Sequence, residues 1–189
     1  MNKLRALFLL IAFITSSNSF GGYEYKVDDD KFEGTKTEWI EGNRLDCSTK
    51  GDVRIFFQPK KISKGKTIVY KLKLGYISVS NGEYYQAEWL FINQGGPLKI
   101  LADGKKITLN PDPGSYHEEV FNGGLEEEVQ YSVPAKFFEK LALANAVEAK
   151  ISGEHYYLVA TFNKDNHKNF DRFYQEVVLS QKYQENKTK

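Results

Sequence analysis

Four glutamates between residues 119 and 128 have the spacing that could perform acid–base chemistry. Glu119 precedes the consecutive acids Glu126, Glu127 and Glu128. Two carboxylates placed roughly 5 to 10 Å apart can hydrolyse a glycosidic bond, one as the acid and the other as nucleophile or base. In a β-strand, Glu126 and Glu128 would share one face, about 7 Å apart. These four glutamates are therefore the candidate catalytic residues of a small carboxylate-dependent hydrolase directed at glycans.

Glu127 invites a second interpretation because it falls on an apolar row. Leu125, Val129 and Tyr131 have the same parity along the chain, so a strand here would place Glu127 among them. Acids are seldom buried beside apolar side chains unless they are paired. The sequence leaves three possibilities for Glu127: the edge of a sheet, an ion pair with a base, or a place in a functional site.

The other reactive side chains form no motif for catalysis or for metal binding. His117, His155 and His167 lack the i, i+4 pairing typical of zinc ligands, and each is predicted to lie at the surface. The sequence contains neither a G-x-S-x-G nucleophile elbow nor a phosphate-binding loop ending in GK[ST]. We therefore expect no cofactor and no metal, and we consider an enzyme less favoured than a non-catalytic protein.

Cys47 is the single cysteine of the chain, so no internal disulfide can form. Its neighbours Arg44, Asp46 and Lys50 are charged, which indicates partial exposure. A catalytic thiol would need a nearby histidine, and the sequence places none beside it. A thiol without a role is the prediction.

Two tyrosines are predicted to point away from the core. Strand alternation places one member of each pair, Tyr84-Tyr85 and Tyr156-Tyr157, on the outer face. An outward tyrosine can stack on a sugar or anchor a protein partner, although it also serves as an ordinary cross-strand stabiliser. Tyr84 and Tyr157 are the candidate binding residues.

Three two-residue turns predict β-hairpins and fix their registers. The turns are Asn81-Gly82, Asp103-Gly104 and Gly153-Glu154. The first predicts the pairs Leu72–Phe91, Leu74–Trp89 and Tyr76–Ala87; the second predicts Ile100–Ile107 and Leu98–Leu109; the third predicts Ile151–Tyr156, Ala149–Leu158 and Val147–Ala160. Each register gathers apolar side chains on one face.

The remaining patterns complete an α+β fold. Residues 38–40, 52–58 and 125–133 are predicted strands, whereas Pro59 and the lysines after it predict a solvated turn. A helix is expected after Pro134, and a second helix is expected after Asn163 or Asp165. The second helix has apolar residues at helical spacing. The prediction is a mainly antiparallel sheet, either a curved sheet or a small sandwich, with two helices in the C-terminal third.

The first nineteen residues have the layout of a cleavable secretory signal peptide. Lys3 and Arg5 precede the apolar run 6–14, and small residues follow up to Ser19. The apolar run is shorter than the roughly 20 residues that span a bilayer, and no later segment is apolar enough to do so. We expect residues 20–36 to be an irregular acidic lead-in, 37–183 a single β-rich domain and 184–189 a polar tail.

The net charge and the predicted signal peptide together favour an exported binding protein. The full chain has a formal net charge of +1, which becomes −1 once Lys3 and Arg5 are removed, so a nucleic-acid partner is not expected. The expected location is the periplasm or the extracellular space. The expected role is a non-catalytic binding or interaction module of the bacterial cell envelope, with an envelope protein or a glycan as partner. The alternatives are the hydrolase above and a protein that assembles through its sheet edges.

Overall fold

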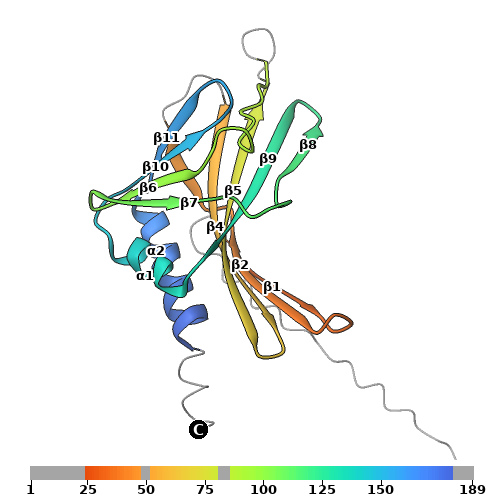
Figure 1. Cartoon of the computed structure of the whole chain (residues 1–189), viewed down its shortest axis with the longest axis vertical. Coiled ribbons are helices and arrows are strands. Elements are labelled where there is room, and N and C mark those ends of the chain that lie inside the picture. The colour runs from red at the N-terminus through yellow and green to blue at the C-terminus, as the bar shows by residue number, and fades with distance from the viewer. Residues whose placement is uncertain (1–23, 48–51, 81–85, 181–189) are drawn as a thin grey trace, which may run out of the picture.

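The computed structural model describes residues 24–47, 52–80 and 86–180, which form a curled antiparallel sheet and two helices (Figure 1). The strands are β1 (Glu24–Asp30), β2 (Thr35–Glu41), β3 (Arg44–Cys47), β4 (Asp52–Lys64), β5 (Thr67–Val79), β6 (Leu98–Ala102), β7 (Lys105–Leu109), β8 (His117–Phe121), β9 (Gly124–Val133), β10 (Val147–Ser152) and β11 (Tyr157–Thr161). The helices are α1 (Ala135–Leu143) and α2 (Lys164–Phe173), the latter continued by the π-helical turn η1 (Tyr174–Leu179). The predicted fold class, with a curved sheet, is confirmed.

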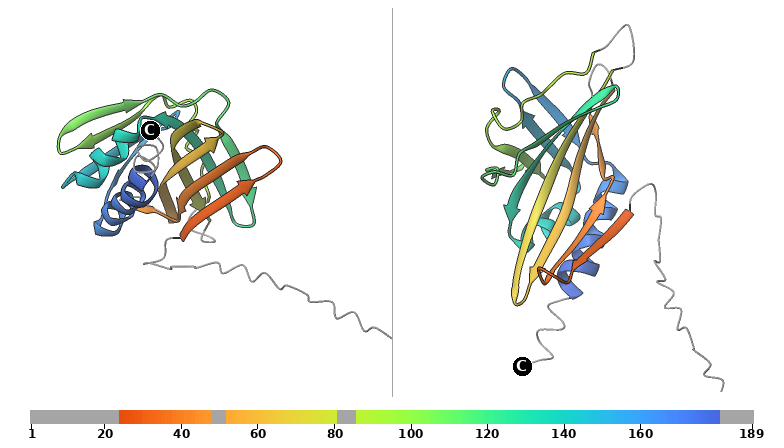
Figure 2. Two further views of the ribbon diagram at one scale, coloured as in Figure 1. Left: turned by 90° about the horizontal axis from the view of Figure 1, so that it is seen from below. Right: turned by 90° about the vertical axis from the view of Figure 1, so that its right-hand side faces the viewer.

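The sheet curls into a half-barrel whose concave side packs against the helices (Figure 2). Its strand order is β7-β6-β10-β11-β3-β4-β5-β9-β8, and β2 pairs with both β1 and β4. The ring of Phe138 in α1 lies at the centre of the core, 5.0 Å from Phe173 and 6.1 Å from Tyr70 of β5 between ring centroids. Burial of such aromatic side chains is the main force that holds the helices to the sheet.

The β4–β5 hairpin forms the long centre of the sheet. Pro59 lies inside β4, so the solvated turn predicted at this point is wrong; the turn comes later, at Gly65. A proline supplies no N–H to a neighbouring strand. At Pro59 the neighbour of β4 changes from β3 to β2, which removes the need for that hydrogen bond.

A buried asparagine network attaches α2 to this break between β2 and β3. Asn43 donates to the Phe57 carbonyl at 2.8 Å, and its Oδ1 accepts from Asn166 at 2.8 Å and Asn169 at 3.3 Å. Asn163 caps the helix by accepting from the backbone amides of Asp165 and Asn166, as predicted for this end. Polar groups buried in this way specify how the helix sits on the sheet.

The three predicted hairpins have different outcomes. The Asp103-Gly104 hairpin is confirmed, with Leu98 opposite Leu109 and positive φ at both turn residues. The third hairpin exists, but its register is wrong by two residues, because Ile151 pairs with Leu158 instead of Tyr156. The first hairpin's predicted pairing is wrong: Leu72, Leu74 and Tyr76 of β5 face Tyr131, Val129 and Glu127 of β9. The Asn81-Gly82 turn itself lies outside the described residues.

The acidic segment expected to be an irregular lead-in is largely a hairpin. β1 pairs with β2 from Glu24–Glu41 to Asp30–Thr35, and β2 continues the sheet beside β4. In Figure 1 this hairpin points away from the body of the protein. Pairing with β2 explains why this segment is a regular strand, since a segment with few apolar residues can still be held by a sheet's backbone hydrogen bonds.

Candidate functional site

Glu127 is fully buried on the concave side of β9 and accepts hydrogen bonds from three backbone amides. Its Oε1 accepts from the backbone amides of Leu90 at 2.5 Å and Phe91 at 2.9 Å, and its Oε2 accepts from the amide of Ile92 at 2.8 Å. The Tyr116 hydroxyl lies 3.2 Å from Oε2. Charge-assisted bonds to backbone amides are among the strongest hydrogen bonds in proteins. Two of the three alternatives from the sequence are wrong: β9 lies between β5 and β8, so Glu127 is not at a sheet edge, and no base among the described residues pairs with it.

This carboxylate explains why residues 86–97 do not form the predicted strand. The amides that a strand would have used in a ladder point at Glu127 instead, and Phe91 adopts a φ of +56°. Such a left-handed conformation is unusual for a bulky residue and needs support from its surroundings. Glu127 supplies that support through three backbone amides, so its role in the structure is to fix this loop.

The same loop shifts the register of the third hairpin. A Cβ on Gly153 would lie 2.0 Å from the Leu90 carbonyl oxygen, so the loop and the turn are in direct contact. The Glu154 amide donates to that oxygen at 3.1 Å, while the Gly153 amide donates to Tyr156 at 2.8 Å. The result is a four-residue loop in place of the predicted two-residue turn.

The other three candidate acids lie together on the convex face of β8 and β9. Glu119 pairs with Glu126 across the two strands, and His117 pairs with Glu128. Glu128 forms an ion pair with Lys73 of β5. Glu127 points to the opposite side, so the structure brings together only Glu119, Glu126 and Glu128. Glu119 is exposed, and Glu126 and Glu128 are half-buried.

Glu126 is the acid whose ionisation is most disturbed on this face. Partial burial, and then the neighbouring carboxylates of Glu128 and Glu119, raise the pKa of Glu126 above its ordinary value, although Lys73 opposes them. A raised pKa in the folded state means that deprotonation costs stability as the pH rises through that pKa.

We therefore expect Glu126→Gln to stabilise the protein at pH 7, by at most about 1 kcal/mol because the site is partly solvated. The difference in unfolding free energy between the variant and the natural chain should shrink toward pH 4, where Glu126 is protonated. Urea unfolding at several pH values measures this. A variant that is less stable than the natural chain at pH 7 would contradict the assignment.

Among the histidines and the cysteine, His117 lies beside these acids, opposite Glu128. His117 and His155 are exposed as predicted, but His167 is half-buried with its ring 5.3 Å from that of Phe162, so its surface prediction is wrong. Burial raises the pKa of the half-buried Cys47 thiol, although Arg44 opposes it, which keeps the thiol in its weakly nucleophilic form. Within the described ranges, no three His, Cys, Asp or Glu side chains are grouped as metal ligands.

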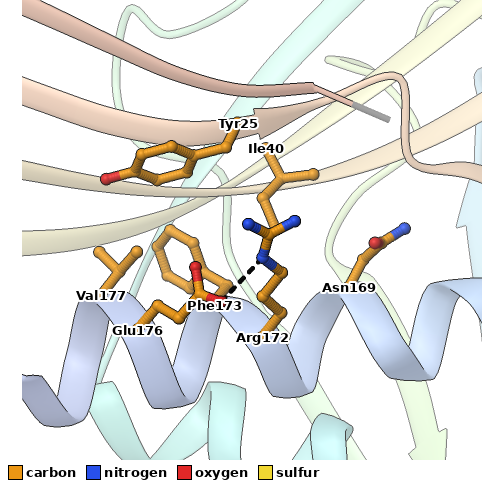
Figure 3. A pocket seen from close by; sticks show the side chains of 7 residues that line it. All are labelled: Tyr25, Ile40, Asn169, Arg172, Phe173, Glu176 and Val177. Carbon is orange, nitrogen blue, oxygen red and sulfur yellow. Dashed lines mark hydrogen bonds and ion pairs between the residues drawn. The ribbon is translucent and has the colours of Figure 1, made fainter. Parts of the chain in front are cut away.

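A small pocket separates the β1–β2 hairpin from α2 and η1 (Figure 3). Tyr25 and Ile40 form its upper side, and the Arg172–Glu176 ion pair lies along the helix below, with 2.9 Å between Nε and Oε1. Its volume of about 10 Å³ holds about one water molecule. This pocket is therefore a packing gap and is too small for a ligand.

The Tyr25 side of this gap leads to a buried ion pair. Lys61 lies 2.8 Å from Oε2 of Glu38, and both side chains are nearly inaccessible. Tyr25 donates to Oε1 of Glu38 at 2.7 Å, and Lys36 lies 3.1 Å from the same oxygen. Burial acts to raise the pKa of Glu38, but the bonds from Lys61, Tyr25 and Lys36 outweigh it and lower that pKa.

The outward face of β6, β10 and β11 carries the most prominent exposed apolar side chains on the sheet's convex surface. Tyr157 is 57% exposed, and Val159 and Leu101 are also exposed. These three side chains, which we call the Tyr157 surface, project on the side opposite the buried Ala149, Ile151 and Ala160. The Lys150 ammonium lies 3.7 Å from the centre of the Tyr157 ring, a cation–π contact.

An open hollow borders the Tyr157 surface. Tyr157, Leu158, Val159 and Thr161 of β11 line it together with Asp46 and Cys47 of β3. The outward orientation predicted for Tyr157 is therefore observed. In the observed register, Tyr157 pairs with Ser152 of β10. Tyr84, the other candidate binding residue, lies outside the described residues.

Comparisons with protein-family models, curated proteins and solved structures find no match to this chain. None of the helices in the described part of the chain is long and apolar enough to cross a membrane. The geometry of the sites must therefore carry the functional argument. Sequence reasoning singled out Glu127 and Tyr157, but it missed the buried Glu38–Lys61 pair, whose partners are 23 residues apart.

Proposed function

We propose that this protein is an exported, non-catalytic binding module of the bacterial cell envelope, and that it binds a protein partner through the Tyr157 surface. Export rests on the signal-peptide layout of residues 1–19. Cell fractionation followed by mass measurement of the chain tests export. We expect a chain cleaved before Phe20 in the envelope fraction, and an uncleaved chain in the cytoplasm would contradict export.

The observation that carries the binding role is the exposed Tyr157 with apolar side chains beside it and charges around them. Tyrosine is enriched at the centres of protein interfaces because its ring buries a large area while its hydroxyl stays satisfied. Val159 lies beside Tyr157 on β11 and forms the apolar centre with it, while Leu101 on β6 is separated from both by Lys150 and Glu148 of β10. Lys150, Glu148, Lys99 and Asp46 supply the charges around this centre. An apolar centre with a polar rim is the usual anatomy of a protein interface.

A protein partner is favoured over a glycan by the position of Lys150. A sugar would stack on the flat face of the tyrosine ring, and the Lys150 ammonium already occupies one such face. A protein can instead contact the ring edge, the hydroxyl and the neighbouring apolar side chains together.

The hydrolase is the weaker candidate. Its supporting observation is the raised pKa of Glu126 beside Glu128, which resembles a proton donor near a second carboxylate. Against it, Glu127 is fully occupied by backbone amides, and Glu128 is paired with Lys73. Glu119, the third acid on that face, is exposed on β8.

The binding role can be tested by cross-linking capture from the native envelope fraction. We expect one stoichiometric protein partner, whose yield falls about tenfold with Tyr157→Ala/Val159→Thr, because interface tyrosines commonly contribute 1 kcal/mol or more. Val69→Thr/Val120→Thr, which changes exposed valines on β5 and β8, is the matched control and should leave the yield unchanged. Equal yields from both variants would contradict the proposal, as would capture of a glycan alone.

A further inference from the structure

A second hollow, separate from the Tyr157 surface, lies between α1 and the β6–β7 hairpin. Its volume is about 390 Å³, within the range of small-molecule sites. Four apolar residues, which we call the groove floor, line it: Ala102, Ile107, Leu143 and Ala144. Leu143 is 68% exposed, which is a high exposure for a leucine beside a core.

Three lysines surround the groove floor, and we call them the lysine rim: Lys105, Lys106 and Lys140. All three are exposed, and no ion pair involves them among the described residues. The rim therefore presents a local excess of positive charge over an apolar surface.

The two acids that line the same groove are engaged elsewhere. Oδ1 of Asp103 accepts from the backbone amides of Asn145 and Ala146, at 2.9 and 3.0 Å. Glu139 is a hydrogen-bond partner of Tyr174, to which it is directed from α1. Neither carboxylate is paired with the lysine rim, so the rim's charge stays available to a ligand.

We propose that this groove binds a single-chain fatty carboxylate, with the alkyl chain on the groove floor and the carboxylate at the lysine rim. Each methylene removed from water favours binding, so the alkyl chain is stabilised by contact with the groove floor. A carboxylate gains charge-assisted hydrogen bonds from the ammonium groups. The small volume favours a single chain over a peptide. This inference is independent of the partner proposed for the Tyr157 surface.

Titration of the isotopically labelled chain with dodecanoate below its micellar concentration tests the proposal by NMR. We expect amide shifts confined to residues 102–107 and 139–146. Lys105→Gln/Lys106→Gln/Lys140→Gln should weaken binding about tenfold, since solvent-exposed charge pairs are individually weak. Leu143→Gln should weaken binding about threefold while leaving the charges unchanged.

Matched controls separate this site from general charge effects and from other ligands. Lys31→Gln/Lys66→Gln/Lys164→Gln removes the same charge from exposed lysines elsewhere and should change the affinity less than twofold. Decanol, which has no charge, should bind more weakly than decanoate, which has the same chain length. The proposal is overturned by absent binding, by shifts mapped to another region, by equal losses in both triple variants, or by tighter binding of an anionic lysophospholipid or an acidic peptide.

Discussion

Replacing Glu127 by glutamine should destabilise the protein by about 2 to 4 kcal/mol, because hydrogen bonds to a charged group contribute roughly 1.5 to 3 kcal/mol and their loss leaves buried amides unpaired. The carboxylate accepts from three consecutive backbone amides, those of Leu90, Phe91 and Ile92. A glutamine amide keeps one oxygen acceptor but turns an N–H₂ donor toward the remaining N–H. Urea unfolding measures the loss, and faster hydrogen exchange at these three amides locates it.

Glu126→Gln is the matched control, since it makes the same chemical change one residue away on the opposite face of β9. It should leave the exchange of the Leu90, Phe91 and Ile92 amides unchanged and should not lower stability at pH 7. If both variants lose similar stability, or if those amides keep their slow exchange in Glu127→Gln, then Glu127 does not fix the loop.

The buried Glu38–Lys61 pair predicts the second large effect. Lys61→Met should cost about 3 kcal/mol, near the lower end for breaking a buried pair, because Tyr25 and Lys36 still partly compensate the Glu38 charge. The lowered pKa of Glu38 adds a pH dependence. A depressed pKa stabilises the fold above the ordinary glutamate value, so this contribution should be lost as the pH falls below about 4.

Two variants serve as controls for that loss. Lys64→Met lies on the same strand, where its partner Glu33 and its own side chain are both exposed, and should cost less than about 0.5 kcal/mol. Glu38→Gln/Lys61→Met removes both charges and should recover much of the stability lost in Lys61→Met. A double variant as unstable as the single one would show that the pair's charge is not what matters. Thermal unfolding at pH 7 and pH 3.5 distinguishes these results.

The sequence predicted those parts of the fold that local patterns determine. The Asp103-Gly104 turn fixes its hairpin because both residues adopt positive φ. The two helices and the β9 strand follow from periodicity in the same way. Each of these elements is specified by residues within about ten positions of one another.

The failures come from contacts between distant residues. The register predicted around Asn81-Gly82 sorted apolar side chains well, but β9 provides an equally apolar row and the loop at 90–92 is bound by Glu127. A period of two cannot show which strand is the partner. The contact of Gly153 with Leu90 likewise shifted a register whose local pattern fitted both alternatives.

The candidate site residues also divide into features that local patterns predicted and contacts between distant residues that they could not predict. An acid on an apolar row was a visible anomaly, so Glu127 could be found. The backbone amides that it binds lie 35 to 37 residues away in the chain and could not be predicted. Tyr157 could be predicted to point outward from alternation alone. Its neighbour Leu101 on the same surface comes from β6, two strands away in the sheet, which the sequence did not order.

Site-specific photo-cross-linking in living cells is the most direct test of the Tyr157 surface as a binding site. A photoreactive residue at Val159 or Leu101 of the full chain should cross-link to one and the same exported protein, and Tyr157→Ala should abolish both adducts. The same residue at Val69, which is exposed on β5, should give no such adduct. Adducts from Val69 alone, or none from Val159 and Leu101, would contradict the proposal that this surface binds a protein partner.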